Sequence, residues 1–244
     1  MTATAVLDNI RVVLCQTSHP GNIGAAARAM KTMGLVSLYL VNPKRFPSPE
    51  AEAMAARSTE LLDAARVCET LDQALVGTVY AAACTARNRD LSHAILTARE
   101  AGQRLVQEAA RGPVAVVFGA EKYGLTVEDV NRCSVITMIP ANPEYSSLNL
   151  GAAVQVLAYE IRQAAEATES YPPSEHAPAR YEDVELFFTH LEQTLYDIEF
   201  LDPRHPKRLM QRMRRLFQRA RLEHEELNIL RGILAAMQKK ARPQ

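Results

Sequence analysis

The chain has 244 residues, 48% of them hydrophobic, and its 28 basic side chains balance 28 acidic ones. This length and apolar content allow one large domain, or one domain with a small extension, around a substantial core. Four scattered cysteines without a C-x-x-C pair favour reduced core thiols in a cytosolic protein over a disulfide framework or a zinc site. No signal-peptide pattern opens the chain, and no apolar run approaches the roughly 18 residues of a membrane span.

The first two thirds of the chain alternate short apolar strands with helical stretches. We expect strands at 10–15, 38–41, 66–68, 78–83, 114–118 and 135–139. Between and after them we expect helices at 22–33, 50–56, 71–75, 98–111 and 148–167. Asn22 is a candidate N-cap of the first of these helices, and Gly34 its stop. Strands that are apolar on both faces and alternate with helices predict an α/β fold with a parallel sheet.

A change of composition then marks a boundary. Pro, Ser and Glu dominate residues 168–179, which is typical of a linker. The remaining chain is helical in character, with helices expected at 181–201, 206–222 and 223–240. We therefore expect a first domain, a linker and a helical extension, over residues 1–167, 168–179 and 180–244.

A polar loop, residues 142–150, leads into the helix expected from residue 148. It carries two adjacent hydroxyls, Ser146 and Ser147, and the amide Asn149. The start of a helix offers free backbone N–H groups beside such side-chain oxygens. This arrangement occurs at binding sites but also at ordinary helix caps, with Ser147 as the cap and Asn149 in the first turn.

The segment from Pro20 to Arg28 is rich in small residues, which let a helix turn approach another backbone closely. One interpretation is a tight turn, an Asn22 cap and an exposed arginine. However, Arg28 lies among alanines on a helix expected to pack on the sheet. A half-buried arginine needs an anion as its partner, and a phosphate would serve.

Two further loops follow expected strands. One contains Gly119 and Gly124; it matches neither the Walker A pattern nor G-x-G-x-x-G, so it is either a plain connection or a ligand-binding loop of another kind. The other contains Arg87 and Arg89, which could bind phosphates or be ordinary surface residues. No histidine spacing suits a metal, and no G-x-S-x-G elbow occurs, so neither a metal nor a serine hydrolase is expected.

The helix expected at 206–222 pairs an apolar stripe with a basic one. The apolar stripe comprises Leu209, Met213, Leu216 and Ala220, and the basic stripe Arg208, Arg212, Arg215 and Arg219. No acidic residue occurs between 203 and 221, so these like charges repel one another. A nucleic acid would relieve the repulsion; a merely solvated face or an acidic membrane surface are the alternatives.

Taken together, three motifs resemble those of the SPOUT superfamily of RNA methyltransferases. They are Asn22 with Arg28 six residues on, Gly119-x-Glu121-x-x-Gly124-Leu125, and Ser146-Ser147-Leu148-Asn149-Leu150. The pattern is most similar to the TrmH-like branch, which methylates ribose 2′-hydroxyls. Within this branch, residues 17–35 and 142–150 resemble the matching segments of enzymes that methylate position 32 of tRNA. The resemblance is strong over residues 8–167, while the helical tail is similar only in kind.

This resemblance implies a trefoil-knotted α/β fold, although unknotted crossovers are the default. It implies a homodimer that binds tRNA and uses S-adenosylmethionine, leaving S-adenosylhomocysteine, to methylate C32 or U32. The cofactor-binding residues it implies are Cys84, Thr85, Ala86, Gly119, Ile139, Ser146, Ser147 and Leu148. A different tRNA or ribosomal RNA target, or a non-catalytic RNA-binding module, remain alternatives.

The resemblance also implies roles for single residues. Arg28 would be the central catalytic residue. Because guanidinium stays protonated, we expect it to act electrostatically, by holding a phosphate and stabilising a developing alkoxide. The residues that orient it and the two substrates would be Asn22, Glu121, Ser147 and Asn149. Arg87 and Arg89 would bind RNA phosphates, and the basic stripe at 208–219 the tRNA body.

Overall fold

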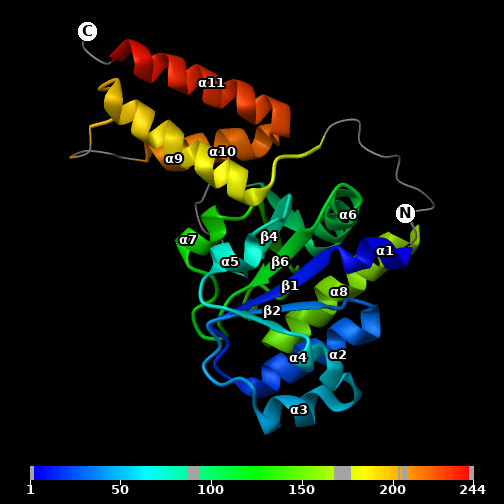
Figure 1. Ribbon diagram of the computed structural model, residues 1–244. Helices are drawn as coiled ribbons and strands as arrows, with labels where there is room; N and C mark the ends of the chain where they lie inside the picture. The colour runs from blue at the N-terminus through cyan, green and yellow to red at the C-terminus, as the bar shows by residue number, and fades with distance from the viewer. Residues whose placement is uncertain (1–2, 87–93, 168–176, 203, 205–207, 242–244) are drawn as a thin grey trace. The chain divides into compact units, whose positions relative to one another are not determined.

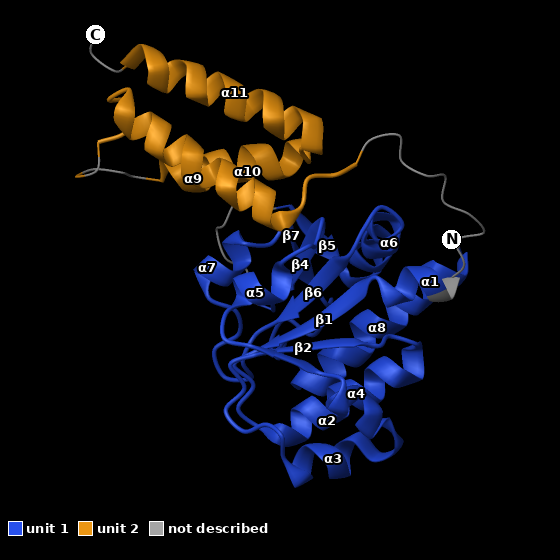
Figure 2. Cartoon of the chain, viewed as in Figure 1, with its two compact units in different colours: residues 1–173 blue, residues 174–244 orange. Residues whose placement is uncertain are grey.

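The computed structural model describes residues 3–86, 94–167, 177–202, 204 and 208–241. The chain divides into two compact units, Met1–Pro173 and Ser174–Gln244 (Figure 2). Among the described residues no helix combines the length and hydropathy that a membrane crossing requires.

Unit 1 is built on a sheet of seven parallel strands in the order β3-β2-β1-β6-β4-β7-β5 (Figure 1). The strands are β1 Ile10–Cys15, β2 Ser37–Val41, β3 Arg66–Cys68, β4 Tyr80–Cys84, β5 Ile95–Thr97, β6 Val114–Phe118 and β7 Val135–Met138. Successive residues of β1 and β6 lie on opposite faces and are buried, apart from the partly buried Arg11, which is why the other residues of both strands are apolar. The predicted parallel α/β fold is confirmed.

Helices cover both faces of this sheet. They are α1 Ala3–Asp8, α2 Pro20–Met33, α3 Pro49–Ala55, α4 Thr59–Asp63, α5 Leu71–Leu75, α6 Ala98–Ala109, α7 Val127–Asn131 and α8 Leu150–Ala167, with a 3-10 turn at Ala56–Ser58. Side chains of α2, α6 and α8 share one hydrophobic core with β1 and β6. The α5 helix packs on β2 and β3. Gly34, in the left-handed region at φ 79°, ends α2 as predicted.

Several short elements were not predicted from the sequence. The three-residue strand β5 pairs with β7 and leaves Ile95 exposed. The sequence therefore shows no continuous apolar run that would predict this strand. Helices α1, α4 and α7 have only five or six residues. Such elements are too short for a periodic pattern and depend on the contacts around them.

Strand register brings the ends of the central strands together. Leu14 pairs with Phe118, Phe118 with Cys84, and Cys84 with Thr137. These four residues form one row near the carboxyl ends of β1, β6, β4 and β7. The loops that follow the four strands therefore start side by side, at the edge where α/β proteins bind ligands.

The described residues of unit 2 form three helices, α9 Tyr181–Asp197, α10 Leu209–Ala220 and α11 His224–Ala241. Its small core holds Phe187 and Phe188 of α9, with the Phe217 ring edge-on to Phe187 at 4.9 Å between centroids. Ala179, which we expected in the linker, is buried in this core and donates its backbone N–H to Leu222. The core of unit 2 thus includes a residue before residue 180.

The predicted apolar stripe of α10 was partly wrong. Met213 packs against the core of unit 2, but its companions are Met210 and Phe217, not Leu209, Leu216 and Ala220. Leu216 and Ala220 are exposed. A different side of α10 faces inward than predicted because the Phe217 ring completes the aromatic cluster with α9.

Candidate functional site

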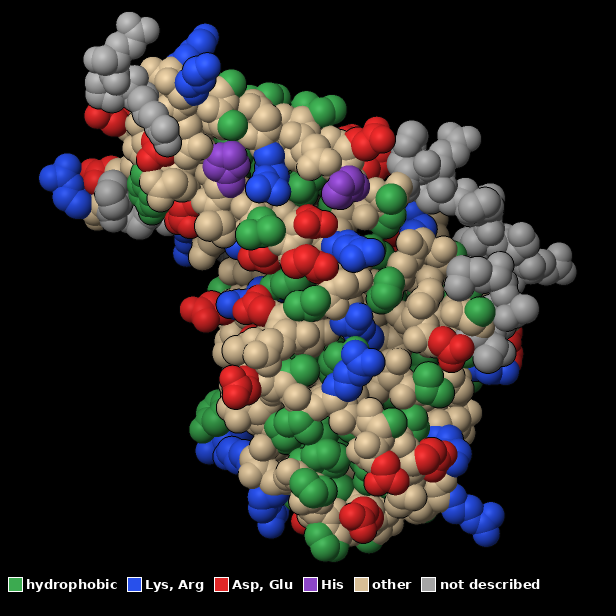
Figure 3. All heavy atoms as spheres, viewed as in Figure 1, with side chains coloured by type: hydrophobic (Ala, Val, Ile, Leu, Met, Phe, Trp, Pro, Cys, Tyr) green, Lys and Arg blue, Asp and Glu red, His purple; other side chains and the backbone are tan. Residues whose placement is uncertain are grey.

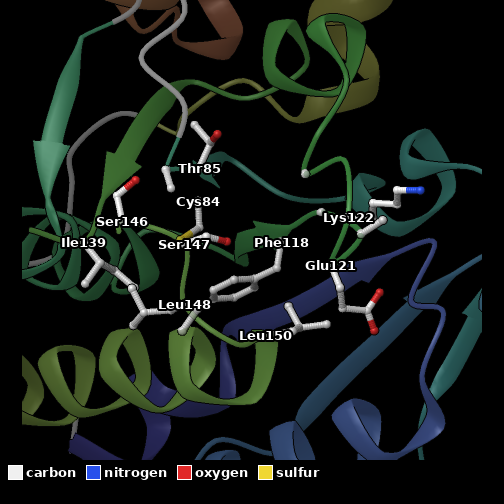
Figure 4. Close-up of a pocket in the computed structure, with 15 residues that line it drawn as sticks. Cys84, Thr85, Phe118, Glu121, Lys122, Ile139, Ser146, Ser147, Leu148 and Leu150 are labelled. Atoms are coloured by element: carbon white, nitrogen blue, oxygen red, sulfur yellow. The ribbon is translucent and has the colours of Figure 1, made fainter. Parts of the chain in front are cut away.

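A cavity of about 440 Å³ lies at the carboxyl edge of the sheet (Figure 4). All eight residues that were expected to bind a cofactor line it, namely Cys84, Thr85, Ala86, Gly119, Ile139, Ser146, Ser147 and Leu148. Four separate segments contribute them: the ends of β4 and β7 and the loops after β6 and before α8. The cavity volume suits a ligand of nucleoside size.

The cavity combines apolar walls with a polar rim. Phe118, Ile139 and Leu148 supply apolar surface, while Ser146 and Glu121 come from opposite sides (Figure 4). Such walls suit the faces of a heterocyclic ring, and the loops add backbone hydrogen-bonding groups. Burial raises the pKa of the Cys84 thiol to about 12, so this thiol is neutral at pH 7 and is not a nucleophile.

A hydrogen-bond network around Glu121 joins the loop after β6 to the start of α2. The Glu121 carboxylate accepts hydrogen bonds from the Ser18 backbone N–H at 3.0 Å, the Ser18 hydroxyl at 2.8 Å and the His19 N–H at 3.1 Å. It also accepts one from Asn22 Nδ2 at 2.9 Å. The negative charge lies beside the amino end of α2, where the helix dipole favours it.

These hydrogen bonds determine the protonation of Glu121. Partial burial raises its pKa, but hydrogen bonds from Asn22 and Ser18 outweigh burial and bring the pKa down to about 2. The group is therefore a carboxylate at neutral pH, with its oxygens occupied as acceptors. This arrangement suits a positioning residue and does not suit a general base.

Asn22 and Asn149 continue the network towards α8. Asn149 Nδ2 donates to Asn22 Oδ1 at 2.9 Å, and Asn149 Oδ1 accepts from the backbone N–H groups of Gly151 at 2.9 Å and Ala152 at 3.4 Å. Asn149 is thus the cap of α8, a role the sequence analysis considered for Ser147. The three motifs meet in one connected set of hydrogen bonds.

The N-cap interpretation of Asn22 was wrong. Helix α2 begins at Pro20, with His19 as its N-cap, and Asn22 is the third helical residue. Proline is well suited to the first position because its missing N–H has no partner there in any case. The Asn22 side chain is thereby released from capping and is used for the contacts with Glu121 and Asn149.

Close contacts explain two glycines near the cavity. A Cβ on Gly119 would lie 2.1 Å from the carbonyl carbon of Gly124, where two turns of the loop touch. A Cβ on Gly151 would lie 2.7 Å from Cβ of Ala25, where α8 crosses α2. Gly151 therefore serves packing within the chain, and Ala153 lines the cavity.

Arg28 is exposed, so the expectation that it is half-buried among alanines was wrong. It lies on α2 six residues after Asn22 and three after Ala25, the residue that touches α8. Neighbouring alanines Ala26 and Ala27 face the core, while Arg28 points to the other side of the helix. An exposed guanidinium is accessible to a large anionic partner.

The candidate RNA-binding arginines differ in what the structure describes. Arg87 and Arg89 lie outside the described residues. Arg208, Arg212, Arg215 and Arg219 are all exposed on or beside α10. Arg214, on the same helix, is used internally: it donates to both Glu185 carboxylate oxygens, at 2.5 and 2.8 Å, and lies 4.4 Å from the Phe188 ring centroid. On the visible face of the molecule, basic and acidic side chains are intermixed (Figure 3).

Sequence reasoning missed some residues of the site. Ser18 holds Glu121 with both its N–H and its hydroxyl, and Phe118 and Lys122 line the cavity. Ser18 follows β1 at the same sheet edge as the other loops, a position that could have indicated a role. Over the described residues, no group of three or more His, Cys, Asp or Glu could hold a metal ion.

Comparison with known proteins agrees with this geometry. Residues 9–159 match the SpoU rRNA Methylase family, and residues 182–244 match the C-terminal domain of tRNA methyltransferase TrmJ. The chain is 51% identical over 237 residues to a "tRNA (cytidine/uridine-2'-O-)-methyltransferase TrmJ" from Escherichia coli, with 96% of each chain covered.

Solved structures give the same picture. The crystal structure of TrmJ from Z. mobilis superposes with a TM-score of 0.81 at 32% identity, over 93% of this chain and 98% of that one. A structure described in terms of 2-OH methylation of C/U34 on tRNA matches with a TM-score of 0.53 at 27% identity, over 65% and 97% of the two chains. This chain therefore belongs to the SpoU methylase family and, within it, to the TrmJ group of tRNA methyltransferases.

Proposed function

We propose that this protein transfers a methyl group from S-adenosylmethionine to the ribose 2′-hydroxyl of a cytidine or uridine at position 32 of tRNA. The observation that carries the proposal is the junction of the three motifs: Glu121, Asn22 and Asn149 are hydrogen-bonded beside a cavity of nucleoside size. The names of relatives that match along nearly the whole chain support the reaction class.

The residues of the cavity fit S-adenosylmethionine. Ile139 and Leu148 offer apolar surface to an adenine ring, and the segment Cys84–Ala86 offers backbone groups to its edge. Gly119 lines the cavity at the start of the loop after β6, and Ser146 and Ser147 add hydroxyls. The bound cofactor supplies a methyl group on a positively charged sulfur, which needs an attacking oxygen held in line.

Arg28 is proposed to act on the attacking oxygen. Its cationic guanidinium holds the phosphate next to the target ribose and stabilises the negative charge that develops on the 2′-oxygen, while the hydroxyl proton passes to solvent water and the methyl group moves from the sulfur to this oxygen. Asn22, Glu121, Ser147 and Asn149 position Arg28 and the substrates, since α2, the Glu121 loop and the start of α8 are joined through them. Exposure of Arg28 leaves it open to RNA.

We propose that further arginine side chains bind the body of the tRNA. Arg87 and Arg89 would hold RNA phosphates. The exposed arginines of α10, Arg208, Arg212, Arg215 and Arg219, would hold the backbone elsewhere without reading bases. Among the described residues, none of these four side chains forms an ion pair like that of Arg214, which supports this division of roles.

The finer features of the fold also belong to the proposal. We propose that unit 1 is closed by a trefoil knot, as family membership suggests; the packing of α8 against both α2 and α6 is compatible with it. We propose a homodimer that acts on tRNA in the cytoplasm. Exposed Ile229, Ile233 and Met237 recur every four residues along α11 and supply one apolar face for a second copy.

One experiment tests the function directly. The protein is incubated with unmodified tRNA and methyl-labelled cofactor, and the labelled nucleotide is mapped by mass spectrometry of nuclease fragments. A 2′-O-methyl group at position 32 is expected. Label at position 34, the position in the description of one structural relative, or on ribosomal RNA, would reassign the target. Label on a base would reject ribose methylation, and failure to bind the cofactor would favour a non-catalytic RNA-binding module.

A further inference from the structure

Two tyrosines are strongly exposed on the two loops that line the cavity. Tyr145, in the loop before α8, is 81% exposed, and Tyr123, in the loop after β6, is 64% exposed. Each is adjacent in sequence to a residue that lines the cavity, Ser146 in one case and Lys122 in the other. Exposed aromatic rings beside a binding cavity are candidates for contact with a partner.

The backbone holds Tyr145 in a defined turn. Its N–H donates to the Asn142 carbonyl at 2.9 Å, and the Glu144 N–H donates to Asn142 Oδ1 at 3.0 Å. Asn142 therefore organises the turn with both its main chain and its side chain. The ring is displayed to solvent from an ordered segment, so little conformational entropy is lost when it binds a partner.

Tyr123 is displayed in a similar way. The Gly124 N–H donates to the Ala120 carbonyl at 2.7 Å, and Gly124 has φ 68°, which closes a tight turn with Tyr123 near its tip. Hydrogen bonds to Glu121 anchor the start of this turn. Lys122 Nζ lies 5.3 Å from the Tyr123 ring centroid, which places a positive charge beside the aromatic face.

We propose that Tyr145 and Tyr123 stack on loop bases near the methylated nucleotide, and that Lys122 contacts a phosphate beside those bases. The inference rests on the proposed function, because the target ribose must reach the methyl donor in the cavity. Its neighbours in an RNA loop then emerge at the rim, where both rings are displayed. Unstacked loop bases are held by aromatic side chains, and an adjacent cation suits the backbone.

The test uses the full chain and a tRNA that carries 2-aminopurine beside the target nucleotide. The chain has no tryptophan, so the probe is observed without indole fluorescence. The wild-type protein is expected to quench the probe by stacking. Tyr145→Phe should preserve the quenching, whereas Tyr145→Ala and Tyr123→Ala should each reduce it and raise the KM for tRNA about tenfold. Affinity for S-adenosylmethionine should not change.

Tyr159→Ala is the matched control, because Tyr159 is 47% exposed on α8 but does not line the cavity. It should leave quenching and KM unchanged. The inference would be overturned if Tyr145→Ala and Tyr123→Ala both showed the same quenching and the same KM for tRNA as the wild type. Dissociation of a dimer by these variants in sedimentation would also overturn it, since the rings would then contact a second copy. Methyl transfer without tyrosine-dependent quenching rejects only the stacking, whereas absence of methyl transfer by the wild-type protein rejects the proposed function.

Discussion

The Asn149 side chain donates a 2.9 Å hydrogen bond to the side-chain oxygen of Asn22, across 127 positions of sequence. Asn149 at the same time caps α8, and Asn22 at the same time donates to Glu121. Because each amide uses its oxygen and its nitrogen for different partners, the orientation of both is determined by the network. The start of α8, the first turn of α2 and the loop after β6 are consequently held together beside the cavity.

Substitution at Asn149 can separate its two roles. Asn149→Ala removes the cap and the bond to Asn22, and should lower the free energy of unfolding by about 1 kcal/mol, or roughly 2–4 °C in Tm. Asn149→Asp retains a capping oxygen but loses the donor that Asn22 requires. It should melt close to the wild type yet lose methyl transfer. Thermal unfolding and a methyl-transfer assay on both variants check this, and equal melting of the two variants would contradict the separation.

Glu121→Gln should reduce stability in a pH-dependent way. The folded pKa is lowered to about 2 from an ordinary value of 4.5, so the carboxylate stabilises the fold fully above pH 4.5. This contribution is lost as pH falls through the folded pKa. The free energies of unfolding of the wild type and of Glu121→Gln, measured in urea, should therefore differ by a constant amount, about 1–2 kcal/mol, between pH 5 and 7. The difference should become smaller towards pH 3. A difference that grows as pH falls would contradict the assigned carboxylate.

Arg28→Ala should abolish methyl transfer without affecting the fold. Because the side chain is exposed, the free energy of unfolding should change by less than about 0.5 kcal/mol. Loss of a group that stabilises developing charge should reduce kcat by at least about a hundredfold. Tritium transfer to tRNA measures the loss of kcat, and calorimetry with S-adenosylmethionine should show nearly unchanged affinity. Full activity of the variant would remove Arg28 from the mechanism.

The arginines of α10 should divide into two classes. Arg212→Ala and Arg215→Ala should each weaken tRNA binding and reduce the salt dependence of log K by about one counterion, with no loss of stability. Arg214→Ala should destabilise unit 2 instead, since Arg214 bonds Glu185 and covers the Phe188 ring. Filter binding at several salt concentrations and thermal unfolding separate the classes. Identical behaviour of the three variants would argue against the assigned faces of α10.

The amino-acid sequence by itself determined the parallel α/β class and the positions of the main strands. Strands such as β1 and β6 carry apolar residues on both faces, and such a run of apolar residues can be recognised directly in the sequence. The family resemblance also named residues that line the cavity, and these residues lie together because loops that follow parallel strands meet at one edge of the sheet.

Tertiary structure alone decided how those residues are used. The exposure of Arg28, the cap at Asn149, the contacts of Ser18 with Glu121 and the inward face of α10 all depend on partners far away in the sequence. Local patterns report which backbone conformation a segment prefers. They do not report which of two possible partners a side chain will find once α2, α8 and the loop after β6 have packed together. That choice is made by the surroundings in the folded chain, where polar groups compete for the hydrogen-bond partners that packing brings near them.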